Sequence, residues 1–200
     1  MRLILKIFLV QPIKYLGDLY HYFYNYLVLK SKNVEYSDFP NVRGKLFIAN
    51  SGRCVFGKKL VFNSSITSNF VGLTKPCTIK VQKNAQLTIG DYSGFSGISI
   101  FCSESIIIGA YVNFGGNVSI WDTDFHPLNF KDRRSHIIRE INTAPIIIED
   151  DVFVGANSMI LKGVSVGARS IIGAGSIVTK NIPADEVWAG SPAKFIKKII

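Results

Sequence analysis

The chain has few of the features that mark disulfide-bonded, disordered or membrane-spanning proteins. Its 200 residues include three cysteines, Cys54, Cys77 and Cys102, an odd number with no C-x-x-C pair. A disulfide framework and a zinc site are therefore not expected, and free thiols favour a reducing cytoplasm. Charged residues make up only 18% of the chain and hydrophobic residues 48%, a balance that excludes an intrinsically disordered protein.

Long hydrophobic runs are also missing. The N-terminus starts with a basic residue followed by apolar ones, as a signal peptide would, but Lys6 interrupts the run, Pro12 follows, and no small-residue cleavage site appears. No uninterrupted stretch of ~20 apolar residues exists, so a membrane-spanning helix is not expected. The length allows one domain with a sizeable core.

Acidic residues are the minority among the charges. The chain has 23 Lys and Arg against 14 Asp and Glu, a net charge of +9, which points to an anionic partner. Charge alone leaves nucleic acid, phospholipid and a phosphorylated cofactor open.

Residues 1–40 form an apolar, aromatic segment that we expect to be helical. Two interpretations of it stay open, and they are compatible: packing against the rest of the protein or a neighbouring subunit, and lying on an anionic membrane surface. Apolar residues spaced three and four apart predict two short helices broken near Pro12, with Ile4, Ile7 and Phe8 in one and Leu16, Leu19, Tyr20, Phe23 and Leu27 in the other.

Residues 41–183 contain a repeat of six residues. A helix cannot keep this period on one face, because six residues advance it by roughly 600°. Short strands turned at regular corners can, with each aliphatic residue pointing inward and glycine relieving the corner. The unbroken run comprises Ile148, Val154, Ile160, Val166, Ile172 and Val178, and small or β-branched residues follow four positions later at Val152, Ser158, Val164, Ser170, Ser176 and Ile182.

The repeat continues upstream less regularly, so the sequence predicts an all-β solenoid of stacked turns. Between Ile120 and Ile146 the hexads stop, and an excursion over residues 121–145 is polar and holds two of the three histidines, which indicates function. Residues 184–200 read as a cap with a short terminal helix and a basic tail. The upstream interior positions are Phe56, Phe62, Ile79, Ala85, Ile89, Phe95 and Phe101, then Ile108, Phe114 and Ile120 after a one-residue slip.

The hexads, together with GAGSIVTKNIPADEVWAGSPAKFIKKI at residues 173–199, resemble the hexapeptide-repeat acyltransferases, and within them the sugar O-acetyltransferase branch. The likeness covers roughly residues 87–199. It implies a left-handed parallel β-helix, unusual because parallel crossovers are almost always right-handed. It also implies a homotrimer with active sites between adjacent prisms and acetyl-coenzyme A (acetyl-CoA) as co-substrate.

His126 stands in the excursion, followed by Pro127, where the resemblance implies the general base. A sugar hydroxyl is too weak an acid to ionise near neutrality, whereas a neutral imidazole can take its proton as the oxygen attacks a thioester. An orienting acceptor is expected on the other ring nitrogen; Asp124 is nearest in sequence, and Asp122 and Glu104 are alternatives. His21 and His136 match no motif, and no metal site is expected.

The resemblance also implies the cofactor site. Ala156 would offer a backbone N–H near the thioester carbonyl, which could stabilise the oxyanion. The alternative for the C-terminal lysines is a solvated face or contact with anionic lipid. Ala174, Thr179 and Lys180 would line the pantetheine and phosphate path, and Lys194 and Lys197 stand where the family often carries Arg against the nucleotide phosphates.

Departures from the family concern the acceptor. Gly94 replaces an acceptor-binding Asn, and Phe153 replaces an aromatic that is often Trp, so a simple galactoside or maltose is not expected. Asn113 and Asn117 could supply polar contacts instead. Trp121 could wall the acceptor site or pack in the core.

The sequence therefore predicts an enzyme that transfers acetyl from acetyl-CoA to a sugar hydroxyl in bacterial surface polysaccharide biosynthesis. Its expected place is the cytoplasm or the inner face of the plasma membrane, with no nucleic-acid partner. An antibiotic or amino-sugar-nucleotide acyltransferase and a non-catalytic hexapeptide scaffold remain alternatives. A γ-type carbonic anhydrase is disfavoured because the three-histidine pattern is missing.

Overall fold

The computed structural model describes residues 11–135 and 141–199. It begins with one helix, α2 (Gln11–Ser31), and the first predicted short helix lies outside the described residues. Pro12 stands in the first turn of α2, where a missing N–H costs no intrahelical hydrogen bond. The expected break near Pro12 is thus the start of a continuous helix.

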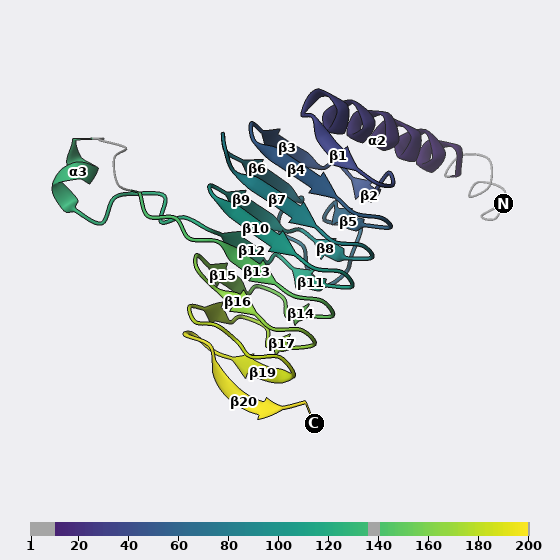
Figure 1. The fold of residues 1–200 in the computed structure, drawn as a ribbon. Coiled ribbons are helices and arrows are strands. Elements are labelled where there is room, and N and C mark those ends of the chain that lie inside the picture. The colour runs from purple at the N-terminus through teal and green to yellow at the C-terminus, as the bar shows by residue number, and fades with distance from the viewer. Residues whose placement is uncertain (1–10, 136–140, 200) are drawn as a thin grey trace.

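Three sheets form the body of the protein, and the coiled chain visits them in turn (Figure 1). Sheet A contains β1 (Val34–Tyr36), β4 (Arg53–Phe56), β7 (Gln86–Ile89), β10 (Ser105–Ile108), β13 (Ile146–Ile148) and β16 (Ser165–Val166). Sheet B contains β2 (Asn41–Gly44), β5 (Val61–Ser64), β8 (Gly94–Ser96), β11 (Asn113–Gly116), β14 (Phe153–Val154), β17 (Ile171–Ile172), β19 (Glu186–Ala189) and β20 (Lys194–Lys198). Sheet C contains β3 (Phe47–Asn50), β6 (Thr78–Val81), β9 (Ser99–Cys102), β12 (Ser119–Trp121), β15 (Met159–Leu161) and β18 (Ile177–Val178).

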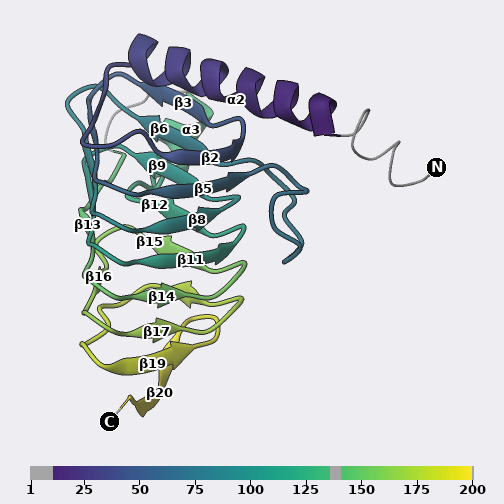
Figure 2. The same ribbon diagram turned by 90° about the vertical axis from the view of Figure 1, so that its right-hand side faces the viewer.

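Strands pair in parallel with the strand three positions later in the chain, from β1–β4 through β15–β18. Each turn of three strands therefore stacks on the previous turn, as Figure 2 shows from the side. This arrangement is consistent with a hexapeptide-repeat β-helix.

The hexad residues form the core, as predicted. All six aliphatic residues from Ile148 to Val178 are buried, and so are the six residues that follow them four positions later. In the upper turns phenylalanines replace them and their rings overlap, with 4.7 Å between the centroids of Phe62 and Phe95 and 5.1 Å between those of Phe95 and Phe114. Stacked aromatic rings thus fill the interior there.

Phe101 is an exception, and its predicted interior position is wrong. Its neighbours Ile100 and Cys102 are buried, so strand alternation turns the Phe101 ring outward. There it pairs in register with Trp121 of the next turn.

The glycines at the corners do not adopt the unusual backbone dihedrals that we expected. Gly90 and Gly155 do not have a positive φ; a Cβ on Gly90 would lie 2.5 Å from the carbonyl carbon of Gly109, so the stacked backbones leave no room for one. The left-handed residues come two positions after such glycines, as at Tyr92 (φ 59°), Tyr111 (φ 57°) and Asn157 (φ 59°).

The C-terminal segment is a strand, so the predicted short C-terminal helix is wrong. β20 pairs antiparallel with β19, and the Phe195 ring meets Trp188 edge-on at 6.5 Å. The free edge of β19 offers this segment backbone hydrogen bonds, which outweigh a helical preference in so short a tail.

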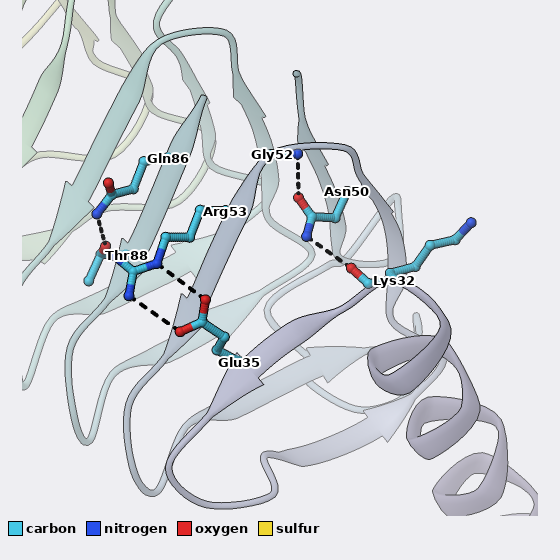
Figure 3. Close-up of polar contacts among 7 residues, drawn as sticks. All are labelled: Lys32, Glu35, Asn50, Gly52, Arg53, Gln86 and Thr88. Carbon is cyan, nitrogen blue, oxygen red and sulfur yellow. Dashed lines mark hydrogen bonds and ion pairs between the residues drawn. The ribbon is translucent and has the colours of Figure 1, made fainter. Parts of the chain in front are cut away.

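Helix α2 is fastened to the first turn at two points. The buried Asn25 side chain donates to the Gly44 carbonyl and accepts from the Leu46 N–H, both at 2.9 Å. At the helix end, Asn50 donates to the Lys32 carbonyl and accepts from the Gly52 N–H (Figure 3). Strand β1 begins directly after, at Val34, inside the segment expected to be helical.

A second excursion, missed in the sequence, separates β5 from β6 over residues 65–77. It folds back along the corner between sheets B and C, where Asn117 accepts hydrogen bonds from the Thr74 N–H and hydroxyl and donates to the Gly72 carbonyl. Within residues 11–135 and 141–199, no helix has the length and apolarity needed to cross a membrane.

Candidate active site

The excursion after β12 leaves the coil on a short paired stalk and carries helix α3 (Phe130–Arg134) away from the body (Figure 1). Thr123 and Thr143 form an antiparallel bridge, and the Asp124 N–H donates to the Asn142 carbonyl at 3.0 Å. The base of the excursion is therefore ordered by its own backbone pairing.

Asp122 ties this stalk to the turn above. Its side chain is fully buried and accepts from three successive backbone N–H groups, those of Ser103, Glu104 and Ser105, at 2.6, 2.8 and 3.0 Å. Both carboxylate oxygens thus accept from the backbone, and no hydrogen bond joins Asp122 to His126 among the described residues.

His126 follows a sharply turned residue. Phe125 has a φ of 62°, and the His126 N–H donates to the Asp124 carbonyl at 2.7 Å across it. The Phe125 ring packs edge-on against Phe101 at 4.8 Å and Trp121 at 5.4 Å. These contacts fix the backbone at His126, while its imidazole is exposed to solvent.

Asp124 has another partner than the predicted one. Its carboxylate pairs with the Lys162 ammonium at 3.1 Å and accepts from Asn142 at 3.5 Å. Among the described residues nothing hydrogen-bonds to the His126 imidazole. Sequence reasoning missed Lys162, because the contact joins two turns that lie next to each other only in the folded coil.

The remaining acid–base candidates lie elsewhere. Glu104 is exposed and contributes only its N–H to Asp122. His21 lines a polar groove beneath α2, and His136 is outside the described residues. In the described part of the chain, no three His, Cys, Asp or Glu side chains cluster as metal ligands would.

Ala156 and Ala174 lie at one corner, where sheet B passes into sheet C on successive turns. Ala156 follows β14 and Ala174 follows β17, and the Gly175 N–H donates to the Ala156 carbonyl at 2.8 Å. Their own N–H groups donate to no other residue in the described ranges. At the corner between sheets A and B the matching amides of Ala110 and Ala168 bond to Asp150 and Glu149.

Of the other predicted cofactor residues, only Lys194 lies near this corner, because it pairs with Ala189, which stacks on Gly173 beside Ala174. Thr179 and Lys180 follow β18 at the corner between sheets C and A, on the same side as the excursion, and both are exposed. Lys194 and Lys197 are exposed on β20 at the end of sheet B. A single chain therefore does not bring the six residues together.

Of the residues predicted to bind the acceptor, Asn117 is engaged in the fold, whereas Asn113 and Phe153 are exposed. Asn117 is fully engaged, because it holds the 65–77 excursion and also donates to Asn157 at 3.2 Å. Asn113 is exposed beside Gly94, where a Cβ would lie 3.0 Å from its Oδ1. Phe153 projects from the outer face of sheet B and is half-exposed.

An apolar groove of about 670 Å³ runs along the outer face of sheet C. It extends from Tyr24 and Val28 of α2 to Trp121 and Phe125 at the base of the excursion. Trp121 therefore lines this groove and does not belong to the interior core.

Comparison with known proteins supports the class of the repeat. Residues 145–180 match the family model described as the hexapeptide repeat of succinyl-transferase. This match and the solved structures below support a hexapeptide-repeat acetyltransferase architecture.

A relative from Schizosaccharomyces pombe, named as an acetyltransferase, is 47% identical over 94 residues, which are 47% of this chain and 44% of the relative. The chain thus spans less than half the length of this relative. A hexapeptide-repeat containing acetyltransferase from Vibrio cholerae, solved in complex with acetyl-CoA, is 31% identical with a TM-score of 0.53, over 57% of this chain and 61% of that one. The polySia-specific acetyltransferase NeuO is 24% identical with a TM-score of 0.56, over 84% and 86%, which shows a shared fold.

Proposed function

We propose that the protein transfers the acetyl group of acetyl-CoA to a hydroxyl of a sugar, with His126 as general base. The observation that carries this proposal is the exposed imidazole of His126, held on an anchored turn at the base of the excursion. The V. cholerae structure with acetyl-CoA supports the donor. Acetyl-CoA supplies an activated thioester, so no covalent enzyme intermediate is needed.

His126 moves the proton in this reaction. Its imidazole takes the hydroxyl proton as the sugar oxygen attacks the acetyl carbon, and returns it to the sulfur of the leaving thiol when the C–S bond breaks. The Ala156 N–H, which donates to no other described residue, fits the role of oxyanion donor. The exposed Lys180, Lys194 and Lys197 fit the phosphates of the donor, each as a point charge.

The site is completed by a second copy of the chain. His126, Thr179 and Lys180 belong to the corner between sheets C and A, whereas Ala156 and Ala174 belong to the corner between sheets B and C. We therefore propose a homotrimer in which the first corner of one chain faces the second corner of the next. The excursion, which projects beyond its own coil in Figure 1, supports such a contact.

Three further features belong to this proposal. The coil is left-handed, as in the family that its hexads resemble, and an experimental structure tests this handedness. The enzyme works in the cytoplasm, which the three free, buried cysteines support. The acceptor belongs to a surface polysaccharide or its precursor.

The test measures thiol release from acetyl-CoA in the presence of candidate glycans, and identifies the product by mass spectrometry. We expect His126→Ala to lower kcat about 10²–10⁴-fold, the range of general acid–base contributions. Lys131→Ala, an exposed change on the same excursion, is the matched control and should retain activity. Unchanged turnover in His126→Ala would rule out the mechanism, and acetylation of an amine in place of a hydroxyl would correct the acceptor class.

A further inference from the structure

The exposed face of helix α2 is apolar, whereas a helix that faces water normally exposes polar residues. Its inward face carries Asn25 and Leu29, which are buried, and its polar residues Asp18 and His21 line the groove toward the coil. The opposite face is apolar: Leu16 is 63% exposed, Phe23 54% and Leu27 62%. A solvated surface helix shows the reverse distribution.

Tyrosines flank this apolar stripe on both sides. At 100° per residue, Leu16, Phe23 and Leu27 fall together on the face opposite the core, with Leu19 beside them. Lys30 ends the stripe at its C-terminal end. The tyrosines on its two margins, all exposed, are Tyr15 and Tyr26 on one and Tyr20 on the other.

The position of the helix leaves this face accessible from Leu16 to Leu27. Figure 2 shows α2 lying across the N-terminal end of the stack, next to β2 and β3. Asn25 and the Lys32 carbonyl hold it to the first turn through hydrogen bonds of 2.9 Å each. The exposed stripe is therefore a fixed feature of the end of the coil, and a flat surface can reach it without meeting the remaining turns.

The positive charge of the sequence is concentrated in its first third. Residues 1–64 contain ten Lys and Arg and three Asp and Glu, whereas residues 65–200 contain thirteen and eleven. The first third of the chain thus carries +7 of the net +9. The Lys45 ammonium lies 4.8 Å from the Tyr20 ring and 5.2 Å from the Tyr24 ring, so positive charge directly borders the helix.

We infer that the outer face of α2 docks this protein on an anionic lipid bilayer. Leucine and phenylalanine enter the boundary between headgroups and acyl chains, and tyrosine suits the headgroup level because its ring is apolar and its hydroxyl polar. The basic N-terminal third adds attraction to acidic headgroups. The inference itself depends only on the surface of α2. It extends the proposed function, because docking places the active site near an acceptor held at a membrane.

The test is flotation of the full chain with phosphatidylglycerol–phosphatidylcholine vesicles and with phosphatidylcholine vesicles. We expect binding to the anionic vesicles that falls with added salt, and a partition constant at least about tenfold lower in Leu16→Glu/Phe23→Glu. Phe70→Glu/Tyr111→Glu adds the same charge at exposed sites away from α2 and should bind as the wild-type chain does.

The inference is overturned if the wild-type chain does not float with anionic vesicles, or if Leu16→Glu/Phe23→Glu floats equally well. If the stripe is instead covered by further copies of the chain, the same variant lowers the molar mass in light scattering and the wild type does not bind vesicles. His126→Ala should float as the wild type does, so failure of docking and failure of the proposed chemistry give different results.

Discussion

The ammonium group of Lys162 lies 3.1 Å from Oδ1 of Asp124, bridging the base of the excursion and the end of β15 one turn below. Both side chains are largely shielded, at 30% and 25% exposure. Together with Asp122, which binds the turn above, this ion pair holds the stalk that presents His126 from both sides. Asp124 thus has a structural partner that competes with any interaction with the imidazole.

Two substitutions distinguish a structural from an orienting role of Asp124. If the carboxylate acts through Lys162, Asp124→Asn and Lys162→Met each lower the free energy of unfolding by about 0.5–1 kcal/mol, the range of partly exposed ion pairs. Neither then moves the pH dependence of kcat. Urea denaturation and pH–rate profiles measure both effects. A displaced profile in Asp124→Asn alone would show that Asp124 orients His126.

Replacing Asp122 should destabilise the whole coil. Asp122→Ala leaves three backbone N–H groups without their charged acceptor, and we expect a loss of about 3 kcal/mol or more in the free energy of unfolding. Glu104→Ala removes an exposed carboxylate from the same corner and serves as the control, with little expected change. Equal stability of the two variants would contradict the burial and hydrogen bonding of Asp122.

The phenylalanine stack supports the upper turns. Phe62 lies fully buried between Phe56 and Phe95, at centroid distances of 5.6 and 4.7 Å, so Phe62→Ala should lower the free energy of unfolding by about 3–5 kcal/mol. Phe70 is 97% exposed, and Phe70→Ala should change it by less than about 0.5 kcal/mol. Thermal unfolding monitored by circular dichroism ranks the two.

The thiols should react only after unfolding. Burial raises the pKa of the Cys54 thiol to about 12, and burial followed by the charge of Asp122 raises the pKa of Cys102. The pKa of such a thiol is higher in the folded state than in the unfolded state, where it is about 8.5. Below that pH both states hold the neutral thiol. Above it the unfolded state ionises first, so the free energy of unfolding falls as the pH rises.

The measurement is alkylation by iodoacetamide near pH 8, followed by mass spectrometry. In the native protein we expect labelling of the buried thiols to be slower by about 100-fold or more than in guanidinium chloride, because the thiolate is the reactive form. Rapid native labelling of Cys54 would contradict its burial.

The C-terminal strand offers a test of donor binding. If Lys194 and Lys197 face the phosphates of acetyl-CoA, Lys194→Ala/Lys197→Ala raises KM for acetyl-CoA about tenfold and leaves kcat nearly unchanged, because phosphate contacts bind ground and transition states alike. Lys83→Ala removes an exposed lysine elsewhere on the coil and should leave KM unchanged. Steady-state kinetics with varied acetyl-CoA measure this KM. An unaltered KM in the double variant would show that these lysines of β20 do not bind the donor.

The regular part of the fold was predictable because a period of six residues admits a simple physical solution. Every inward residue from Ile148 to Val178 could be named, since each repeat copies the previous one. Irregular parts were harder. The interval between Phe62 and Ile79 is far longer than a hexad, but a polar loop and a distorted turn look alike in sequence, so the 65–77 excursion was missed.

The candidate site was only partly predictable, for a related reason. His126 could be located because the repeat stops at the excursion, yet the partners of the acidic residues depend on which turns lie next to each other. Asp122 accepts a hydrogen bond from the Ser103 N–H, and Asp124 pairs with Lys162. Both contacts join neighbouring turns, and the sequence alone does not show which residues of those turns lie side by side. The strand at Lys194–Lys198 was missed because its pairing edge on β19 is likewise a product of the fold.

The two ends of the coil differ from its middle, since α2 covers the first turn and the antiparallel β20 closes sheet B at the last. A stack of parallel turns without such ends would expose unpaired backbone to any identical stack and could grow into a filament. Neither α2 nor β20 repeats the geometry of an internal turn. In the described part of the chain, the stack of parallel turns therefore stops at these two elements.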